Sequence, residues 1–132
     1  MGAALSTETK RWLVQEAEGT LDRVKDDRDF GDQTSQLRNL VQIAQEESEI
    51  SVLRNFIRYQ TGRKATQKFW SLIHQDVIRI LEEIGKRPDL QEDGARKAAI
   101  QQFFGYLVRH YVYLEALRKE ARSQAHAAGG RR

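Results

Sequence analysis

The sequence predicts an all-α protein, a compact bundle of about five helices, from three observations. Pro88 is the single proline in 132 residues, so almost the whole chain is free to be helical. Runs of β-branched residues between turn signals are absent, and strict alternation of apolar and polar residues never persists. Apolar residues instead recur every three or four positions. Because such helices cannot bury their apolar faces alone, we expect them to pack on one another.

The first helix is predicted over residues 6–24, followed by a solvated loop over residues 26–32. Gly19 weakens the second half of this helix, since glycine costs about 1 kcal/mol relative to alanine there. The second helix opens with Thr34 or Ser35 as its N-cap, where a side-chain oxygen accepts a hydrogen bond from a free backbone amide. Its buried face is predicted from four apolar residues at helical spacing: Leu37, Leu40, Val41 and Ala44.

The third and fourth helices are predicted to flank a short turn. The third covers residues 49–61 and stops at Gly62, a residue type that commonly follows a helix C-terminus. Thr66 is expected to cap the fourth helix, which ends at Gly85, shortly before the proline. The apolar face of the fourth helix consists of Phe69, Trp70, Ile73, Val77, Ile80, Leu81 and Ile84.

The fifth helix is the longest that the sequence predicts. It begins near Gly94 and reaches about Arg122. Its apolar positions are Phe103, Phe104, Leu107, Val108, Tyr111, Leu114 and Leu117. Residues 123–132 are small and polar with two glycines, and we expect a flexible, disordered tail there. The chain is therefore expected to form a single helical domain over residues 1–122, followed by that tail.

Composition argues against several classes of function. The chain has no cysteine, which excludes disulfide scaffolds, zinc–thiolate sites, iron–sulfur clusters and thiol catalysis. No apolar run approaches ~18 residues and the N-terminus lacks the pattern of a secretion signal, so we expect a cytoplasmic protein without a membrane span. His74 and Asp76 do not face each other at a spacing of two, and His110 has no evident carboxylate partner. We therefore expect no enzymatic activity, no catalytic or metal site and no cofactor.

Positive charge is concentrated in one part of the chain. The 22 basic and 19 acidic residues give a net charge of +3, yet residues 50–75 contain no acidic residue at all. The basic residues of that window are Arg54, Arg58, Arg63, Lys64 and Lys68. Residues 16–32 contain seven acidic residues and only three basic ones. A surface selected only for solubility mixes both signs, so this segregation indicates a binding function.

The polar residues of the third helix share one face. At ~100° per residue, the side opposite its apolar face carries Ser51, Arg54, Asn55 and Arg58. Guanidinium groups match phosphate oxygens, and asparagine or serine can bond sugar or phosphate. The alternative is a solvated face that only keeps the protein soluble, but we favour contact with nucleic acid. The residues predicted to bind RNA are Arg38, Arg54, Asn55, Arg58, Arg63, Lys64, Lys68 and Arg109.

The fifth helix carries a second candidate surface. A stripe apart from its apolar face is formed, at positions i, i+4, i+7 and i+11, by Gln102, Tyr106, Arg109 and Tyr113. Aromatic rings interleaved with arginine are suited to stacking on unpaired bases. The alternative is that these tyrosines belong to the core. We favour the core, because a long helix in a small bundle is often buried on two sides.

Three stretches, in this order and spacing, resemble motifs of one family. The first is Thr34-Ser35-Gln36-Leu37-Arg38, similar to a Thr-Ser-Gln-aliphatic-Arg helix start. The second is Tyr59-Gln60-Thr61-Gly62-Arg63, similar to a Tyr-x-x-Gly-Arg segment, with Phe69 following. The third is Phe103-Phe104-Gly105-Tyr106-Leu107-Val108-Arg109-His110-Tyr111, similar to an aromatic C-terminal helix. Together they span roughly residues 33–117 and resemble the small, all-helical Csm subunit of type III-A CRISPR effector complexes.

The resemblance implies a non-catalytic subunit in antiviral defence. Several copies would stack beside the guide RNA (crRNA) and its target RNA, contact the RNA backbone without sequence specificity, and bind other subunits of the effector complex. The isolated chain could form a homodimer. By position, Arg38, Gly62 and Arg63 match the family motifs, whereas the other predicted contacts rest on charge or on the stripe of the fifth helix. Tyr106 and Arg109 replace residues that are typically small in the family.

Two other functions fit the same residues. A helix-turn-helix DNA-binding protein would read duplex DNA with the polar side of the fourth helix, formed by Thr66, Gln67, Lys68, Ser71 and Gln75. The broad apolar face of that helix argues against this function. A helical protein–protein adaptor would instead bind acidic proteins through the basic patch. Preference for a duplex DNA would favour the first alternative, and little affinity for RNA at moderate salt would favour the second.

Overall fold

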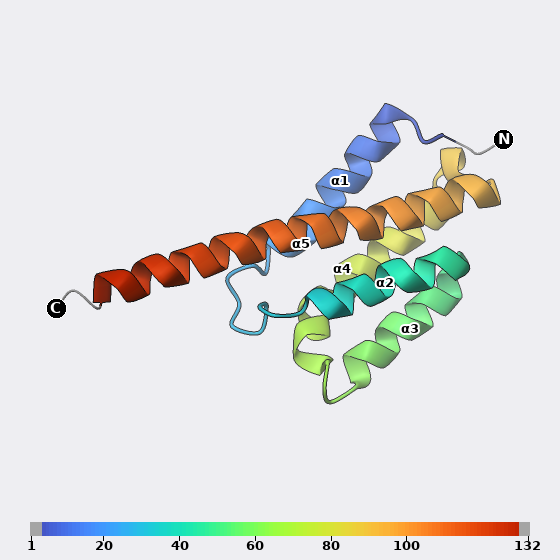
Figure 1. Ribbon diagram of the computed structural model, residues 1–132. Helices are drawn as coiled ribbons and strands as arrows, with labels where there is room; N and C mark the ends of the chain where they lie inside the picture. Colours follow the sequence, from blue (N-terminus) through green and yellow to red (C-terminus); the bar gives the residue numbers. More distant parts are fainter. Residues whose placement is uncertain (1–3, 130–132) are drawn as a thin grey trace.

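The chain folds into five α-helices and one short 3₁₀-helix (Figure 1). The computed structural model describes residues 4–129, with side chains through residue 128. The helices are α1 (Thr7–Asp22), α2 (Thr34–Glu46), α3 (Ile50–Gly62), α4 (Gln67–Lys86), the 3₁₀-helix η1 (Pro88–Leu90) and α5 (Asp93–Gly129). No strand occurs among the described residues, so the predicted all-α bundle is confirmed. None of these helices is long and apolar enough to cross a membrane.

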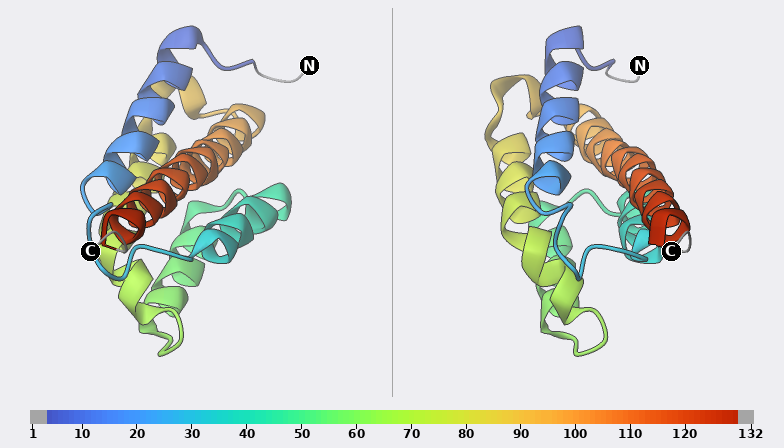
Figure 2. Two further views of the ribbon diagram at one scale, coloured as in Figure 1. Left: turned by 60° about the vertical axis from the view of Figure 1, so that its left-hand side comes forward. Right: turned by 90° about the vertical axis from the view of Figure 1, so that its left-hand side faces the viewer.

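Helix α5 is the longest element and organises the others. Its 37 residues span about 55 Å, and Figure 1 shows it crossing the bundle and extending beyond it. Helices α1 and α2 pack on different sides of α5 (Figure 2), while α4 contacts α1, α3 and α5. Helix α3 packs mainly on α4. This arrangement leaves α3 and the turn that follows it at the outside of the bundle (Figures 1 and 2).

The core is aromatic where α4 and α5 meet the loop between α1 and α2. The ring of Tyr111 lies 4.8 Å from that of Phe30 and 5.8 Å from that of Phe69, measured between centroids. Trp70 packs edge-on against Phe69 and is fully buried. The seven apolar residues predicted for the fourth helix are all buried in α4, so that face is confirmed.

The loop between α1 and α2 is anchored to α5, which corrects the prediction of a solvated loop. Phe30 is fully buried. The hydroxyl of Tyr111 donates a hydrogen bond to the Phe30 carbonyl and accepts one of 2.9 Å from the Gln33 amide. The aspartates of the loop favour solvent, but burial of the large Phe30 ring in the core holds the loop against the bundle.

Two further side chains of α5 extend this anchor toward its C-terminal end. A carboxylate oxygen of Glu115 accepts a hydrogen bond of 3.0 Å from the Asp32 amide. The guanidinium of Arg118 donates to the carbonyls of Lys25 and Asp27, at 3.2 and 3.3 Å, and lies over the Phe30 ring. Helix α5 therefore satisfies backbone groups along most of the loop.

The predicted helix starts need correction at α2 and α4. Thr34 and Ser35 lie inside α2, and its N-cap is Gln33, whose side chain makes no capping hydrogen bond. Thr66 is the N-cap of α4, as predicted, but its hydroxyl does not bond the helix amides. It donates instead to the carbonyl of Gln60, 2.6 Å away, because the end of α3 lies beside it.

Two predicted helix ends also need correction. Gly62 is still part of α3, and the chain leaves the helix through Arg63 in an extended conformation (φ −73°, ψ 130°), which requires no left-handed glycine. Helix α4 continues through Gly85, and Pro88 begins the next element. A Cβ atom at Gly85 would lie 2.6 Å from Cδ1 of Ile50, so glycine permits a close approach of α3 rather than ending α4.

The predicted C-terminal tail is shorter than expected. Helix α5 continues to Gly129, so residues 123–129 are helical, while residues 130–132 lie outside the described part of the chain. Residues 119–128 include four alanines and several other good helix formers, and the first glycine after them is Gly129. The propensity of these residues explains why the helix does not stop at Arg122.

Candidate nucleic-acid interface

Helix α3 presents a polar face to solvent because its apolar residues are used against α4. Leu53 and Ile57 are fully buried. Asn55, Arg58 and Tyr59, on the other side, are exposed, and Tyr59 is 60% exposed. The predicted separation of faces is confirmed. The exposure of an aromatic side chain among these polar residues was not part of the prediction.

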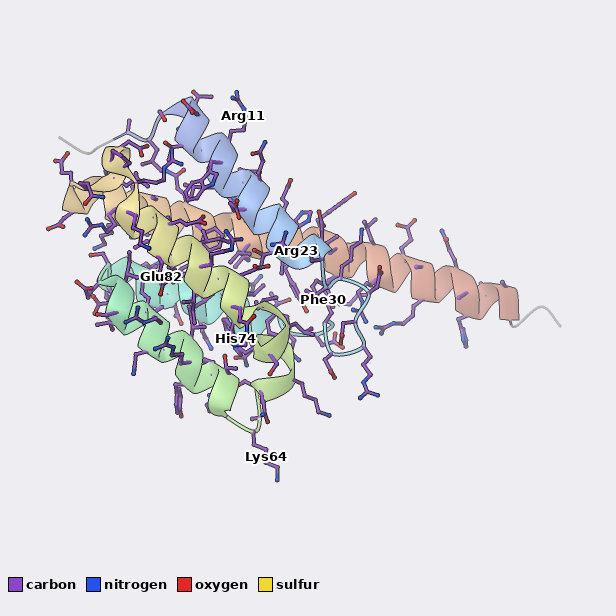
Figure 3. All side chains as sticks on the ribbon, turned by 180° about the vertical axis from the view of Figure 1, so that it is seen from behind. Arg11, Arg23, Phe30, Lys64, His74 and Glu82 are labelled. Atoms are coloured by element: carbon purple, nitrogen blue, oxygen red, sulfur yellow. The ribbon has the colours of Figure 1, made fainter. Side chains whose placement is uncertain are left out.

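Arg54 is not free to bind phosphate as the sequence pattern suggested. Its Nη1 lies 3.2 Å from the Oε1 atom of Glu82 on α4. Figure 3 shows Glu82 on the stretch of α4 that runs beside α3. The charge pattern missed this pair because Glu82 lies outside the acid-free window and reaches Arg54 only through helix packing. The pair compensates one of the positive charges of the window.

Four cationic side chains without such partners gather at the end of α3 and the start of α4. We call Arg58, Arg63, Lys64 and Lys68 the α3–α4 corner; all four residues are exposed. Among the described residues, no carboxylate lies within 4.0 Å of any of their cationic nitrogens. Arg63 is held by a hydrogen bond of 3.3 Å to Gln60. Figure 3 shows Lys64 at the outermost point of the turn.

A small hollow borders the corner on the side of the α1–α2 loop. It has a volume of about 210 Å³, and its charged lining residues are Arg28, Asp29, Lys64 and Lys68. Three cations thus face one carboxylate. The hollow also lies at the N-terminal end of α4, where no side chain caps the helix and the free backbone amides carry partial positive charge. The local field therefore favours an anion.

The structure places the other two predicted arginines away from this corner. Arg38 is exposed on α2, one turn before Gln42. Gln42 and Gln60 both line a polar cleft of about 440 Å³ between α2 and α3. Arg109 is on α5, and its guanidinium carbon lies 5.9 Å from the ring centroid of Tyr106. It lines a separate groove between α1 and α5. Arg38 thus lies on α2 one turn from a residue of the next cleft, and Arg109 belongs to another surface.

The expectation of core tyrosines in the stripe on α5 is wrong for Tyr113, which is 57% exposed. Tyr106 is half-buried, and its hydroxyl donates to Gln102 within the same helix. The core tyrosine is Tyr111, outside the stripe. This difference arises because α1 and α2 leave part of α5 uncovered.

The histidines do not form a metal site. His74 bonds the Trp70 carbonyl of its own helix through Nδ1. Nε2 of His110 lies 2.8 Å from Asp22 and its Nδ1 lies 3.7 Å from Glu18, so this histidine has the carboxylate partners that the sequence did not reveal. No group of three possible metal ligands occurs within residues 4–128.

The polar side of α4 proposed for duplex DNA is only partly available. Gln67, Lys68, Ser71 and Gln75 are exposed, but Thr66 is buried. The same helix packs on α1, α3 and α5 along its length.

Comparisons of this chain with protein-family models, with curated proteins and with solved structures give no match. The function of this chain is therefore inferred from its residues and their geometry. The features that sequence reasoning missed are the exposed ring of Tyr59 and the contribution of Arg28 to the hollow. The exposure of Tyr59 follows from its place on the α3 wheel, whereas Arg28 reaches the corner only through the anchored loop.

Proposed function

We propose that this chain is a non-catalytic RNA-binding subunit that holds the sugar–phosphate backbone of RNA at the α3–α4 corner. The observation that carries the proposal is the gathering of four exposed cations without a carboxylate partner within 4.0 Å among the described residues. Such a group attracts a nucleic acid because its cations replace the counterions condensed on the phosphates, and those counterions are released into solution. It carries no base-reading geometry, so binding is expected to be indifferent to sequence.

Neighbouring groups suit the same ligand. Arginine forks fit phosphate oxygens, and the exposed ring of Tyr59, 5.7 Å from the Arg63 guanidinium carbon, offers a face on which an unpaired base can stack. Asn55 adds an exposed amide one turn before Tyr59. Single-stranded or guide-paired RNA therefore fits this surface better than a duplex read in its major groove.

The resemblance to the small Csm subunit supports a specific setting for this activity. In a type III-A CRISPR effector complex, base pairing of the crRNA reads the target, so a subunit beside it needs only to grip the backbone. Arg38 and Arg63, which match the family motifs, are both exposed, and Arg63 donates a hydrogen bond to Gln60, which lines the polar cleft between α2 and α3. The proposed partners are crRNA and target RNA, other subunits of the complex and further copies of this chain.

The test compares two triple variants in RNA binding followed by fluorescence anisotropy. Arg58→Ala/Arg63→Ala/Lys64→Ala is expected to lower affinity for a mixed-sequence single-stranded RNA. The salt dependence should also become shallower, by about 0.7 in the log–log slope for each phosphate that the variant no longer neutralises. The matched control removes the same charge from the far end of the molecule: Lys10→Ala/Arg11→Ala/Lys86→Ala. Figure 3 shows Arg11 at the end opposite Lys64.

The proposal requires the corner variant to bind more weakly than the control variant while both keep the helical circular dichroism of the parent. Equal affinity of the two variants would show that the corner is not the RNA site. Preference of the parent for one duplex DNA sequence would support a helix-turn-helix function instead. Negligible binding of the parent to any RNA at moderate salt would support an adaptor for acidic proteins.

A further inference from the structure

The C-terminal part of α5 is exposed to solvent along its described length. Every residue from Lys119 to Ala128 is exposed, and Figure 1 shows this part of α5 extending beyond the other helices. We call residues 119–128 the arm. Isolated helices of this length are marginal in water, so a long helical arm is more stable when another surface covers it.

Exposed apolar side chains precede the arm directly. Val112, Tyr113 and Leu117 are 46%, 57% and 43% exposed, and they are three of the five large apolar side chains exposed on the described molecule. Tyr113 also lines a groove of about 320 Å³ between α1 and α5, together with Val14 and Tyr106. Tyr113 thus belongs both to this groove, whose other lining residues include Glu18, Arg109 and His110, and to the exposed apolar residues at the base of the arm.

One stripe of α5 joins the groove to the arm at the alternating spacing of four and three that coiled-coil seams use. Its members are Gln102, Tyr106, Arg109, Tyr113, Ala116, Glu120, Ser123 and Ala127. The first four are large and lie beside the rest of the bundle, and the last four include three small residues and lie mainly on the arm. Val112 and Leu117 border the stripe on its two sides.

The stripe is complementary to itself when two copies of α5 run antiparallel. About a two-fold axis between residues 114 and 115, Tyr113 of one chain lies opposite the partner's Ala116, and Tyr106 lies opposite the partner's Ser123. Gln102 lies opposite the partner's Ala127, so three of the four large residues each meet a small one. Arg109 lies opposite the partner's Glu120, so the two charges in the stripe pair twice, once on each side of the axis.

We infer that this protein forms an antiparallel homodimer in which the arm of each chain fills the α1–α5 groove of the other. The seam from residue 102 to residue 127 is about 38 Å long. The small side chains of the arm allow close approach to the rings of Tyr106 and Tyr113. This interaction is separate from the α3–α4 corner, so one dimer would present two corners to RNA.

The experiment is sedimentation equilibrium of the full chain without RNA, so its outcome is independent of the proposed function. The parent is expected to sediment at twice the 15.3 kDa mass of one chain. Arg109→Glu and Glu120→Arg each place like charges opposite one another twice. Each is expected to raise the dimer Kd by at least about tenfold. The double variant, Arg109→Glu/Glu120→Arg, restores opposite charges and is expected to return the Kd to within about threefold of the parent.

Arg122→Glu is the matched control, because Arg122 is an exposed arginine on the side of α5 away from the stripe. This control is expected to dimerise like the parent, and circular dichroism should confirm that all variants stay helical. A parent that remains monomeric at every concentration would overturn the inference and leave the stripe to a different partner. Failure of the double variant to recover, or equal weakening by the control, would overturn the antiparallel register.

Discussion

At the scale of single residues, Tyr111 connects the core to the backbone of the α1–α2 loop. Its ring packs against both Phe30 and Phe69, and its hydroxyl donates a hydrogen bond to one carbonyl of the loop and accepts one from an amide. Both backbone groups lose their partner if the hydroxyl is removed. A buried polar group without a partner is destabilising by about 1–3 kcal/mol.

Tyr111→Phe should therefore lower the free energy of unfolding by about 1–3 kcal/mol, measured by urea denaturation. Tyr59→Phe is the control, because that hydroxyl belongs to a largely exposed side chain with no hydrogen bond to the described residues. Equal stability of the two variants would contradict the anchoring role of the Tyr111 hydroxyl.

Ionisation of Tyr111 should make the free energy of unfolding depend on pH in the alkaline range. Burial raises the pKa of Tyr111 to about 12, whereas an unfolded tyrosine ionises near 10. The unfolded chain therefore loses its proton first, and this phenol should lower stability as the pH rises from about 10 to 12, by an amount of the order of 2 kcal/mol. Below pH 10 it should have no effect. Urea midpoints of the parent should fall more steeply over this range than those of Tyr111→Phe; parallel curves would contradict the prediction.

Asp32 has a left-handed backbone, with φ of 63°, and it is the one described non-glycine residue with positive φ. Glycine adopts this conformation freely, whereas alanine is strained there by about 1–2 kcal/mol. Asp32→Gly should therefore be more stable than Asp32→Ala by about 1 kcal/mol in thermal unfolding. In a helix such as α1 the order is reversed, so Gln15→Gly against Gln15→Ala gives the control.

At the scale of elements, α5 has two parts that differ in their packing. Its first two-thirds pack against α1, α2 and α4, whereas every side chain of the arm is exposed and only its first turn, at Ala121, borders the α1–α2 loop among the described residues. In dilute protein, amides of residues 119–128 should exchange with solvent far faster than those of residues 100–114, because the arm can open without disturbing any tertiary packing. Hydrogen exchange read by mass spectrometry measures both segments.

Raising the protein concentration should slow exchange in the arm, since the partner's groove then covers it. Exchange in residues 100–114 should change much less. Strong protection of the arm in dilute protein would contradict the prediction, because every side chain of the arm is exposed in the described chain.

Periodicity predicted the elements well where burial depends on residues close in sequence. The buried face of α4 follows from seven apolar residues at helical spacing, and all seven are buried. Helix ends were less predictable, since they depend on neighbours that are distant in sequence or on propensity alone. The hydroxyl of Thr66 donates its hydrogen bond to the carbonyl of Gln60, and the side chain of Ile50 packs so close to Gly85 that a Cβ atom would not fit there.

At the scale of the whole molecule, ion pairs connect α1 with α4, whereas the four cations of the α3–α4 corner take part in none within the described chain. Between α1 and α4, Arg79 bridges Glu16 and Glu83 at 3.1 Å, and Arg23 lies 2.6 Å from Asp76. The α3–α4 corner has no such partners among the described residues. The acid-free window therefore predicted where four exposed cations without a carboxylate partner in the described chain lie, and RNA binding there remains the proposal. The capture of Arg54 by Glu82 could not be predicted, because only the packing of α3 on α4 brings the two together.

Salt should therefore affect RNA binding and folding differently. If each of the four cations at the corner neutralises one phosphate, raising salt from 50 to 200 mM should weaken RNA binding by about 50-fold. The free energy of unfolding should change by less than about 1 kcal/mol, because exposed ion pairs contribute little. Anisotropy titrations and urea denaturation in the same buffers measure the two effects. RNA affinity that does not vary with salt would contradict backbone binding.

The anchor between α5 and the α1–α2 loop has a mechanical consequence. The loop forms one wall of the basic hollow, and Tyr111, Glu115 and Arg118 hold that wall immediately before α5 leaves the bundle. A force on the arm would therefore reach the contacts of these three side chains with the loop before it reaches the rest of the bundle. Those contacts hold the wall of the hollow, so a second chain bound to the arm would act on the residues that shape the anion-binding surface.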